Sequence, residues 1–227
     1  MTAAICISFI PKTVNDALQL IEEAEKYDPN FIEVRLDRIK ETKRLCEIAA
    51  SAKTPLIATN RSTSCGGFFQ GKEEERLKIL FEAANSGFKY VDIEVEATNL
   101  RKIVNSLRQI GVKPIISFHD FEETPHIGKL KTVFKTQIEN EAEICKIVTT
   151  AKTMEDNLTL MKFLSQVSKK AKVVCFAMGP LGTISRFLSP LFGGFFTIAS
   201  LKKGEETAPG QLTIQELKTA YKALGVE

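Results

Sequence analysis

The strongest constraint on how this chain can fold is a regular alternation between short apolar runs and longer amphipathic stretches. Eight apolar runs of strand length are spread over the 227 residues, and each is followed by a segment with helical character. Short apolar runs separated by helix-length segments predict parallel strands joined by helical crossovers. Eight such units in a chain of this length indicate an α/β fold of the (β/α)8 TIM-barrel type.

The expected elements follow the hydrophobic pattern along the whole chain. The expected strands are Ala4–Ile10, Phe31–Asp37, Pro55–Arg61, Tyr90–Val95, Pro114–His119, Glu143–Thr149, Lys172–Met178 and Phe195–Leu201. The expected helices are Val14–Lys26, Thr42–Ala52, Glu73–Ser86, Ala97–Gln109, a stretch within Thr124–Asn140, Met154–Lys169, a short segment near Ser185–Leu188, and Ile214–Leu224.

A doubly wound open sheet is the competing architecture. That fold normally carries a glycine-rich turn after its first strand, whereas the first strand here ends in "SFIPKT", without a glycine. No linker, low-complexity run or internal repeat divides the chain. We therefore expect residues 1–227 to form a single (β/α)8 catalytic domain with parallel strands.

The charge and hydropathy patterns exclude several classes of protein. The chain has 31 basic and 28 acidic residues, and its basic clusters are short, so a nucleic-acid partner is not expected. No stretch approaches the roughly 18 unbroken apolar residues of a membrane span. The N-terminal "MTAAICISFIPK" has no basic segment before its apolar run, so it is interpreted as a first strand and not as an export signal.

The cysteine and histidine content bears on redox compartment and metal binding. Five cysteines are an odd number, and none form a C-x-x-C pair. This pattern disfavours a disulfide framework and a zinc site, and it favours a reducing, cytoplasmic location. With only two histidines, a histidine-rich metal cluster is excluded as well. We expect no metal and no other cofactor.

Ionisable residues recur on one face of several expected strands. Side chains alternate across a strand, so in "FIEVRLD" the apolar Ile32 and Val34 share the face that must meet the helices. The charged face then points into the barrel, and "YVDIEV" repeats the pattern with Asp92 and Glu94. Applied to the other strands, the same alternation predicts that five residues converge on one cavity: Glu33, Arg35, Glu94, His119 and Lys146.

Lys146, in the middle of the apolar "EICKIV", is the most informative of these residues. A barrel interior is normally a packed apolar core, and charges there are costly unless they serve one another or a ligand. A lysine in a dry cavity is expected to have its pKa lowered from about 10.4 toward about 7–8. Its neutral amine can attack a ketone and form a protonated Schiff base.

The neighbouring residues suggest how such an imine would be used. His119 can move protons near neutral pH, and arginines can hold an anionic group through paired hydrogen bonds. The chemistry indicated is imine-mediated, either aldol cleavage or elimination of a β-hydroxyl. Taken singly, the same residues have structural interpretations: an ion pair on the strand of Glu33, a core histidine, and a lysine that extends to the barrel rim.

Six segments of the chain resemble those of the type I 3-dehydroquinate dehydratase family, over nearly the whole length. They are "FIEVRLD", "TNRS", "SFHDF", "EICKIV", "AMGPLGTISR" and "TAPGQL". The resemblance implies a carbon–oxygen lyase of the shikimate pathway that converts 3-dehydroquinate to 3-dehydroshikimate and water. It implies no cofactor, and it implies a homodimer.

The resemblance also implies roles for particular residues of this sequence. Lys146 takes the Schiff-base role and His119 the proton-shuttle role. Arg186, Thr207 and Gln211 are expected to hold the substrate carboxylate, and the segment from Thr207 to Gln211 is expected to act as a lid. The remaining substrate contacts expected are Ser8, Glu33, Arg35 and Arg61, and the possible supporting residues are Met178, Glu94 and Cys65.

One segment departs from the family pattern. The family usually has R-x-x-x-E-G-G after its third strand, with the glutamate near the catalytic histidine, whereas this chain has "RSTSCGG". Cys65 therefore stands where a carboxylate is expected, and a thiol is a weak hydrogen-bond partner that is mostly neutral at pH 7. Glu33 or Glu94 is the hypothesised substitute for orienting His119.

Two other functions stay open at this point. A class I aldolase acting on a phosphorylated sugar would need a phosphate-binding loop near the seventh and eighth strands. A barrel that binds a small acid or a partner protein without catalysis would leave Lys146 unmodified by its ligand.

Overall fold

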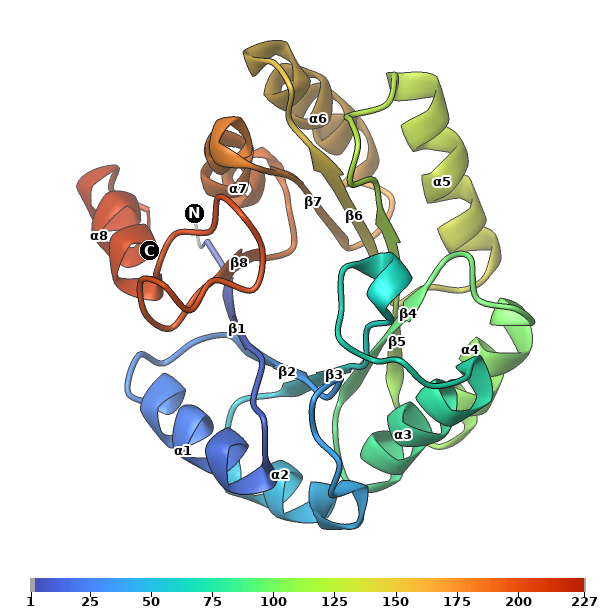
Figure 1. Cartoon of the computed structure of the whole chain (residues 1–227). Coiled ribbons are helices and arrows are strands. Elements are labelled where there is room, and N and C mark those ends of the chain that lie inside the picture. The colour runs from blue at the N-terminus through green and yellow to red at the C-terminus, as the bar shows by residue number, and fades with distance from the viewer. Residues whose placement is uncertain (1–2, 227) are drawn as a thin grey trace.

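The computed structural model describes residues 3–226, and its central feature is a ring of eight parallel strands surrounded by helices (Figure 1). The strand order in the sheet is β7-β6-β5-β4-β3-β2-β1-β8. Every pairing in this sheet is parallel. The predicted (β/α)8 barrel is confirmed, and the open doubly wound alternative is wrong.

The elements have the following bounds. The strands are β1 (Ile5–Phe9), β2 (Phe31–Arg35), β3 (Leu56–Thr59), β4 (Tyr90–Glu94), β5 (Lys113–His119), β6 (Ile144–Thr150), β7 (Val173–Met178) and β8 (Thr197–Ala199). The α-helices are α1 (Val14–Glu25), α2 (Leu45–Ser51), α3 (Glu73–Asn85), α4 (Leu100–Gln109), α5 (Ile127–Glu139), α6 (Met154–Val167), α7 (Thr183–Leu188) and α8 (Ile214–Ala223). Short 3-10 turns are η1 (Thr42–Arg44), η2 (Thr63–Cys65), η3 (Pro180–Gly182) and η4 (Ser189–Phe192).

Local sequence signals account for the start of three helices. The hydroxyl of Thr13 accepts a hydrogen bond from the Asp16 backbone N–H and caps α1, and Thr213 with Glu216 forms a capping box on α8. Helix α4 begins three residues later than expected, because Asn99 adopts a left-handed conformation with φ of 60° just before it. These residues set where each helix starts beneath the strand ends.

The eighth strand is shorter than expected, and a backbone hydrogen bond between the segment before β8 and the start of β7 spans the gap in the ring. Strand β8 ends at Ala199. The next residue, Ser200, forms an isolated bridge with Thr213, and its N–H donates to the Leu212 carbonyl. On the other side, the Phe195 N–H donates to the Val173 carbonyl at 2.7 Å, across the gap between β8 and β7. The chain that leaves β8 therefore returns over the barrel before it enters α8.

The barrel interior is divided into an apolar floor and a polar upper part. The floor is a cluster of buried side chains from inward-facing positions, including Phe31, which packs against Tyr90 and Phe196 with ring centroids 5.6 and 5.0 Å away. Two residues further along β2 and β4, the inward positions are Glu33 and Asp92. The predicted alternation is confirmed, and the apolar floor keeps water from reaching the charges from below. No helix within residues 3–226 is long and apolar enough to cross a bilayer.

Candidate active site

Lys146 of β6 lies in the polar upper part of the barrel and is 4% exposed. Its Nζ donates to Glu33 Oε1 at 3.0 Å and to Asp92 Oδ2 at 2.9 Å. The pairing across the ring is possible because both carboxylates stand on inward-facing positions, Glu33 on β2 and Asp92 on β4. The buried lysine is therefore matched by two carboxylates and does not extend to the rim.

Both carboxylates are held in place by further donors. Glu33 accepts hydrogen bonds from the hydroxyls of Ser8 at 2.7 Å and Thr59 at 2.8 Å. Burial by itself would raise the pKa of Glu33, but the Lys146 cation and the Ser8 hydrogen bond lower it to about 2. This carboxylate is therefore ionised throughout the neutral range.

Asp92 is the second carboxylate, and three hydrogen bonds, from Lys146, Arg61 and Ser117, keep it ionised. Its Oδ1 accepts from Arg61 Nη2 at 2.8 Å and from the Ser117 hydroxyl at 2.6 Å. Burial alone would raise the pKa of Asp92, but the Arg61 and Lys146 cations hold it well below its usual range. The inward-facing set proposed for the cavity left out Asp92, although it lies two residues before Glu94 on the same face.

The pKa of Lys146 is shifted in the direction opposite to the one expected. Burial by itself would lower this pKa, but the carboxylates of Asp92 and Glu33 outweigh it and raise the pKa above its ordinary value. The expectation of a pKa lowered toward neutrality is therefore wrong for this structure. The sequence shows one buried lysine, whereas the structure shows two anions within 3.0 Å of it.

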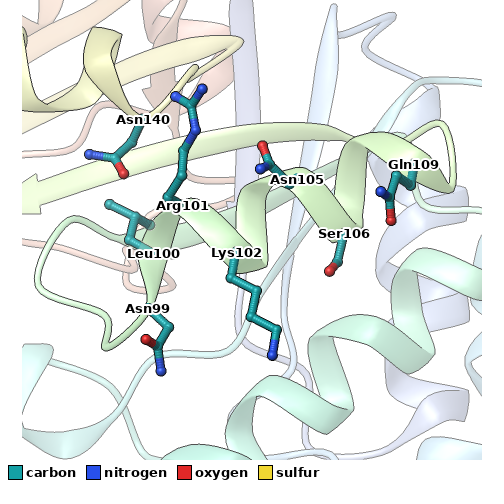
Figure 2. Close-up of a pocket in the computed structure, with 8 residues that line it drawn as sticks. All are labelled: Asn99, Leu100, Arg101, Lys102, Asn105, Ser106, Gln109 and Asn140. Atoms are coloured by element: carbon teal, nitrogen blue, oxygen red, sulfur yellow. The ribbon is translucent and has the colours of Figure 1, made fainter.

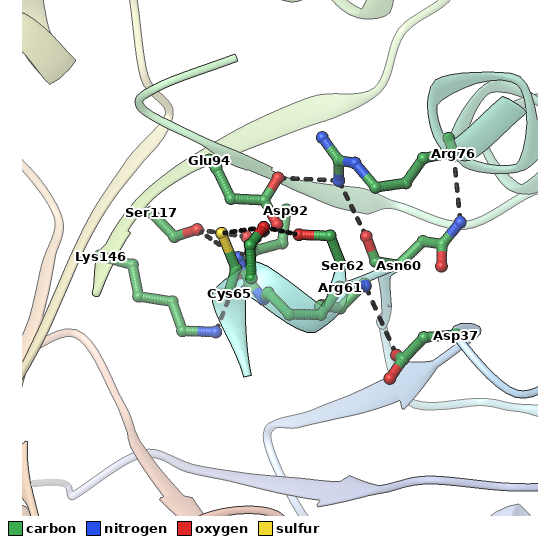
Figure 3. A network of polar contacts seen from close by, with 12 residues as sticks. Asp37, Asn60, Arg61, Ser62, Cys65, Arg76, Asp92, Glu94, Ser117 and Lys146 are labelled. Carbon is green, nitrogen blue, oxygen red and sulfur yellow. Dashed lines mark hydrogen bonds and ion pairs between the residues drawn. The ribbon is translucent and has the colours of Figure 1, made fainter. Parts of the chain in front are cut away.

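Arg61 and Glu94 extend the charged network away from the lysine (Figure 3). Arg61 Nη1 donates to Glu94 Oε1 at 2.9 Å, and Arg76 of α3 pairs with Glu94 Oε2 at 2.7 Å. Arg76 is buried and also donates to the Asn60 carbonyl. Glu94 thus lies behind Arg61 and lines a neighbouring hollow with Arg76, not the cavity that Lys146 faces.

His119 ends β5 and faces the same cavity as Lys146. Its ring stacks on Phe121 with a centroid distance of 5.9 Å and an interplanar angle of 13°. Burial and the Arg61 and Lys146 cations hold the pKa of His119 well below its ordinary value, so the imidazole is neutral at pH 7. Within residues 3–226, no hydrogen bond reaches this imidazole, and neither Glu33 nor Glu94 takes the orienting role hypothesised for them.

The segment after β3 folds over the cavity and brings Cys65 to its wall. Gly66 has φ of 74°, and a Cβ there would lie 2.8 Å from the Phe121 ring. At Gly67 a Cβ would lie 2.0 Å from the Arg61 carbonyl oxygen. Only glycine fits at these two positions, so the loop can pack directly on the aromatic ring that stacks on His119.

Arg35 is tied to this loop through a neighbouring carboxylate. Arg35 Nε and Nη2 each donate to Asp37, both at 2.7 Å. Asp37 also accepts from the Phe68 backbone N–H at 3.0 Å, on the far side of the loop that carries Cys65. Arg35 therefore lines the cavity in a fixed orientation.

Arg186 of α7 is the one cavity residue whose charge has no opposite charge beside it among the described residues. It is 2% exposed, and its Nε and Nη1 atoms have no hydrogen-bond partner. Its Nη2 makes a long contact of 3.4 Å with the Pro209 carbonyl, and its guanidinium lies 4.5 Å from the Phe176 ring centroid. Burial lowers the pKa of Arg186 to about 9. Buried polar atoms are rarely left unpaired, so this guanidinium is suited to an anionic ligand.

The segment between β8 and α8 lies over the cavity beside Arg186. Thr207 and Gln211 are bonded to each other, with Gln211 Nε2 donating to the Thr207 hydroxyl at 2.9 Å. Thr207 also lies 3.2 Å from the hydroxyl of Ser8, which in turn donates to Glu33. Gly210 has φ of 81°, and a Cβ there would lie 2.3 Å from the Gly179 carbonyl oxygen, so the loop packs closely on the turn after β7.

Ten of the twelve predicted site residues line this cavity directly. They are Glu33, Arg35, Arg61, Cys65, His119, Lys146, Met178, Arg186, Thr207 and Gln211. Ser8 lies beneath it, hydrogen-bonded to Glu33, and Glu94 lies behind Arg61. Prediction missed Asp92, Thr59, Ser117 and Phe121. The alternation along each strand could have indicated the first three, whereas the ring of Phe121 reaches the site only through loop geometry.

Another hollow, on the surface of the molecule, has none of the features of the cavity around Lys146. It runs along the outer face of α4, where Arg101, Lys102, Asn105 and Ser106 project to the surface (Figure 2). Arg101 is already paired with Glu141 at 2.6 Å. These side chains are mostly exposed and hold no buried ionisable group, so the candidate active site is the cavity at the carboxyl ends of the strands.

Sequence comparisons with known proteins show the family to which this chain belongs. The family described as Type I 3-dehydroquinase matches residues 5–227. A 3-dehydroquinate dehydratase of Dehalococcoides mccartyi is 40% identical over 197 residues, covering 87% of each chain. The protein of the same name from Methanocaldococcus jannaschii is 34% identical over 227 residues, covering 98% of this chain and all of the relative.

Solved structures agree with the sequence comparisons. The 3-dehydroquinate dehydratase of Geobacillus kaustophilus superposes with a TM-score of 0.92 at 25% identity, covering 99% of this chain and 92% of that one. The type I enzyme of Clostridium difficile, solved with covalently modified comenic acid, gives a TM-score of 0.90 at 25% identity, covering 98% and 92%. With its barrel, its buried lysine and a match over almost its whole length, this chain belongs to the type I 3-dehydroquinase family.

Proposed function

We propose that this chain is a 3-dehydroquinate dehydratase that forms a Schiff base at Lys146, and so carries out the third step of the shikimate pathway. The observation that carries the proposal is the shared cavity of a buried amine, a neutral imidazole and an unpaired buried guanidinium. The substrate offers a matching ketone, an acidic C–H beside it, a β-hydroxyl and a carboxylate.

Lys146 attacks the ring ketone, and one water leaves as the imine forms. The amine must first lose a proton, which the neutral imidazole of His119 in the same cavity accepts and then returns to the carbinolamine hydroxyl as that group leaves as water. The protonated imine then occupies the position of the ammonium, next to Asp92 and Glu33. The same two carboxylates that raise the pKa of the amine therefore stabilise the iminium cation.

The iminium draws electrons from the adjacent carbon, which makes the elimination possible. His119 removes the α-proton to give an enamine, and the same imidazolium returns a proton to the β-hydroxyl, which leaves as water. Hydrolysis of the product imine consumes one water and restores Lys146. The cycle loses one water overall, which is the stoichiometry of a dehydratase.

The remaining residues bind the substrate in this proposal. Arg186, with Thr207 and Gln211 from the closing segment, holds the carboxylate. Arg35, with Glu33 and Arg61, faces the ring hydroxyls, and Ser8 supports Glu33 and Thr207 from below. Met178, Glu94 and Cys65 are proposed as supporting residues, Glu94 through its ion pair with Arg61. Closure of the segment over the ring excludes water from the imine.

The direct test is turnover of 3-dehydroquinate by the purified chain, in buffer containing a metal chelator. The product gains a carbon–carbon double bond conjugated with its ketone, so an increase in ultraviolet absorbance reports the reaction. Sugar phosphates assayed in parallel test the aldolase alternative. A folded protein that leaves 3-dehydroquinate unchanged, or that cleaves sugar phosphates instead, contradicts the proposal.

Replacement of Arg186 by glutamine is expected to weaken substrate binding strongly. Loss of a charge-assisted contact to the carboxylate costs about 1.5–3 kcal/mol, which raises KM about 10- to 150-fold. Because the guanidinium is unpaired in the free protein, thermal stability should be unchanged or higher. Steady-state kinetics and thermal unfolding of the variant check both expectations, with Lys170→Gln on the surface as the control. An unchanged KM contradicts the carboxylate role.

A carboxylate restored at position 65 is expected to alter the pH profile. In Cys65→Glu, a new anion near the ring raises the pKa of His119, which burial and neighbouring cations depress in this chain. Since His119 acts as a base in its neutral form, the acidic limb of kcat/KM should move to higher pH. Cys65→Gln, which has the same size and no charge, is the control. A pH profile that is the same in both variants shows that position 65 does not act on His119.

The assembly and location of the protein are also proposals. We infer a homodimer from the family resemblance, and a cytoplasmic location from the unpaired cysteines. That residues 1–227 form one catalytic domain is a further proposal. Sedimentation equilibrium at several concentrations tests the dimer, and a monomer at all of them contradicts it.

A further inference from the structure

A glutamine occupies the core-facing stripe of α5, where an apolar residue is expected. The buried positions of this helix are Leu130, Phe134 and Gln137, spaced four and three residues apart. Such a stripe is normally apolar throughout, and glutamine is mostly an exposed residue. Gln137 is nonetheless fully buried, with an exposed fraction of 0%.

The side-chain amide of Gln137 bridges the two strands that carry the proposed catalytic pair. Its Nε2 donates to the carbonyl of Ile116 on β5 and to the carbonyl of Lys146 on β6, both at 2.9 Å. Since both partners are acceptors, the amide nitrogen must face them, and the orientation of the amide is determined. Gln137 is therefore bonded to the backbone of Lys146 itself and to a residue three positions before His119.

The bridge lies on the helix side of the sheet, away from the cavity. Helix α5 packs against both β5 and β6 (Figure 1), and the Cα of Ser117 on β5 is paired with that of Lys146 on β6. Gln137 does not line the cavity. Any effect that it has on the reaction must therefore act through the two strands.

Stability alone does not explain the choice of glutamine. Its Oε1 is buried without a hydrogen-bond partner, and an unpaired buried oxygen is unfavourable. Leucine or methionine at this position would complete the apolar stripe and remove the unpaired oxygen, but it would also remove the two hydrogen bonds that Nε2 donates. What glutamine provides, and an apolar residue cannot, is the pair of hydrogen bonds to the backbone of β5 and β6.

We propose that Gln137 is a positioning residue, which fixes β6 against β5 so that the amine of Lys146 and the imidazole of His119 keep the separation needed for proton transfer. The proposal rests on the proposed Schiff-base function of these two residues. A misplacement of about 1 Å at a reacting centre can cost about a hundredfold in rate. Gln137 achieves the alignment from outside the barrel, without narrowing the cavity.

The test compares Gln137→Met with Phe134→Leu, a packing variant one turn earlier on the same stripe. Gln137→Met keeps the volume and loses the donor, so kcat should fall about 10- to 100-fold. KM should stay within about twofold, because Arg186 and the closing segment are untouched. The melting temperature should fall less than in Phe134→Leu, because removal of the unpaired oxygen partly offsets the two lost hydrogen bonds. Phe134→Leu should lower the melting temperature and leave kcat near that of the wild type.

A second readout is independent of turnover. Amide hydrogen exchange of residues 145–147 should be faster in Gln137→Met than in the wild type, and unchanged relative to the rest of the barrel in Phe134→Leu. Wild-type turnover, measured alongside, separates failure of the proposed function from failure of the positioning role. If Gln137→Met retains wild-type kcat, or if its loss of kcat matches that of Phe134→Leu, Gln137 does not position the pair.

Discussion

Lys146→Ala is expected to reduce kcat by about 10⁴-fold or more and to leave a folded barrel. The variant has no amine to form the imine, so the elimination loses its electron sink. Removal of a covalent catalyst in other enzymes has effects of this size or larger. Within residues 3–226 no other lysine lines the cavity, so no neighbouring amine there can replace it. Kinetics with the absorbance assay, together with circular dichroism, check the expectation.

Lys146→Arg is the matched variant that keeps the positive charge at position 146 but removes the nucleophilic amine. It keeps a cation beside Asp92 and Glu33 but offers no nucleophilic amine, because the guanidinium stays protonated. We expect it to be as inactive as Lys146→Ala, and more stable, because the two buried carboxylates retain a positive partner. Substantial turnover by either variant contradicts the assignment of the nucleophile.

Asp92→Asn is expected to have the largest effect on stability. Asp92 contacts both Lys146 and Arg61 inside the barrel, at 2.9 and 2.8 Å. Removing one member of a buried ion pair typically costs about 3–5 kcal/mol, because it leaves its partners uncompensated. Urea unfolding at pH 7 should therefore show a lower free energy of unfolding by about 3 kcal/mol. Glu47→Gln, which breaks an exposed pair with Arg44, should leave the free energy of unfolding nearly unchanged, because solvent screens surface pairs.

The pH dependence of stability gives a second check on Asp92. The pKa of this carboxylate is depressed in the folded state, so its contribution to stability is complete above its unfolded pKa of about 3.9. As the pH falls below that value, the unfolded chain binds a proton that the folded chain does not, and stability is lost. Between about pH 4 and pH 2 the wild type should lose stability more steeply than Asp92→Asn. Parallel curves contradict an ionised Asp92 in the core.

Asp92→Asn should also alter the reaction. The pKa of Lys146 should fall, because one of the two carboxylates that raise it is gone. The iminium loses the same stabilisation, so we expect kcat to fall even though a neutral amine becomes more accessible. In the proposed mechanism the carboxylates therefore serve the cationic intermediate and not the free amine.

The fold could be predicted from the sequence because the alternation of apolar and polar residues in each strand shows which of its faces meets the helices. In "FIEVRLD" the apolar residues face the helices and Glu33 and Arg35 face inward, and the parallel pairing sets Glu33 beside Ser8 of β1 and Arg35 beside Thr59 of β3. The inward direction of Lys146 could be predicted in the same way. The alternation of side chains along a strand does not give the distance between side chains on strands that are not neighbours. The contact between Lys146 and Glu33 is such a case.

The errors of prediction have that common origin. The pKa of Lys146 was expected to fall because only burial was considered, whereas Asp92 and Glu33 lie within 3.0 Å of Nζ and reverse the shift. Glu94 was a candidate partner of His119, but Arg61 and Arg76 hold it elsewhere. The unpaired state of Arg186 and the role of Gln137 depend on what each side chain contacts across the fold, which no local pattern reveals.

The central claim is that the Nζ of Lys146 becomes covalently joined to the ketone carbon of the substrate. Borohydride added during turnover delivers hydride to that iminium carbon and converts it to a stable secondary amine. Peptide mass spectrometry should then show the reduced substrate on the peptide that contains Lys146, and the wild type should lose activity in proportion to the label. Label on a peptide without Lys146, or turnover that borohydride neither labels nor inhibits, would contradict the account.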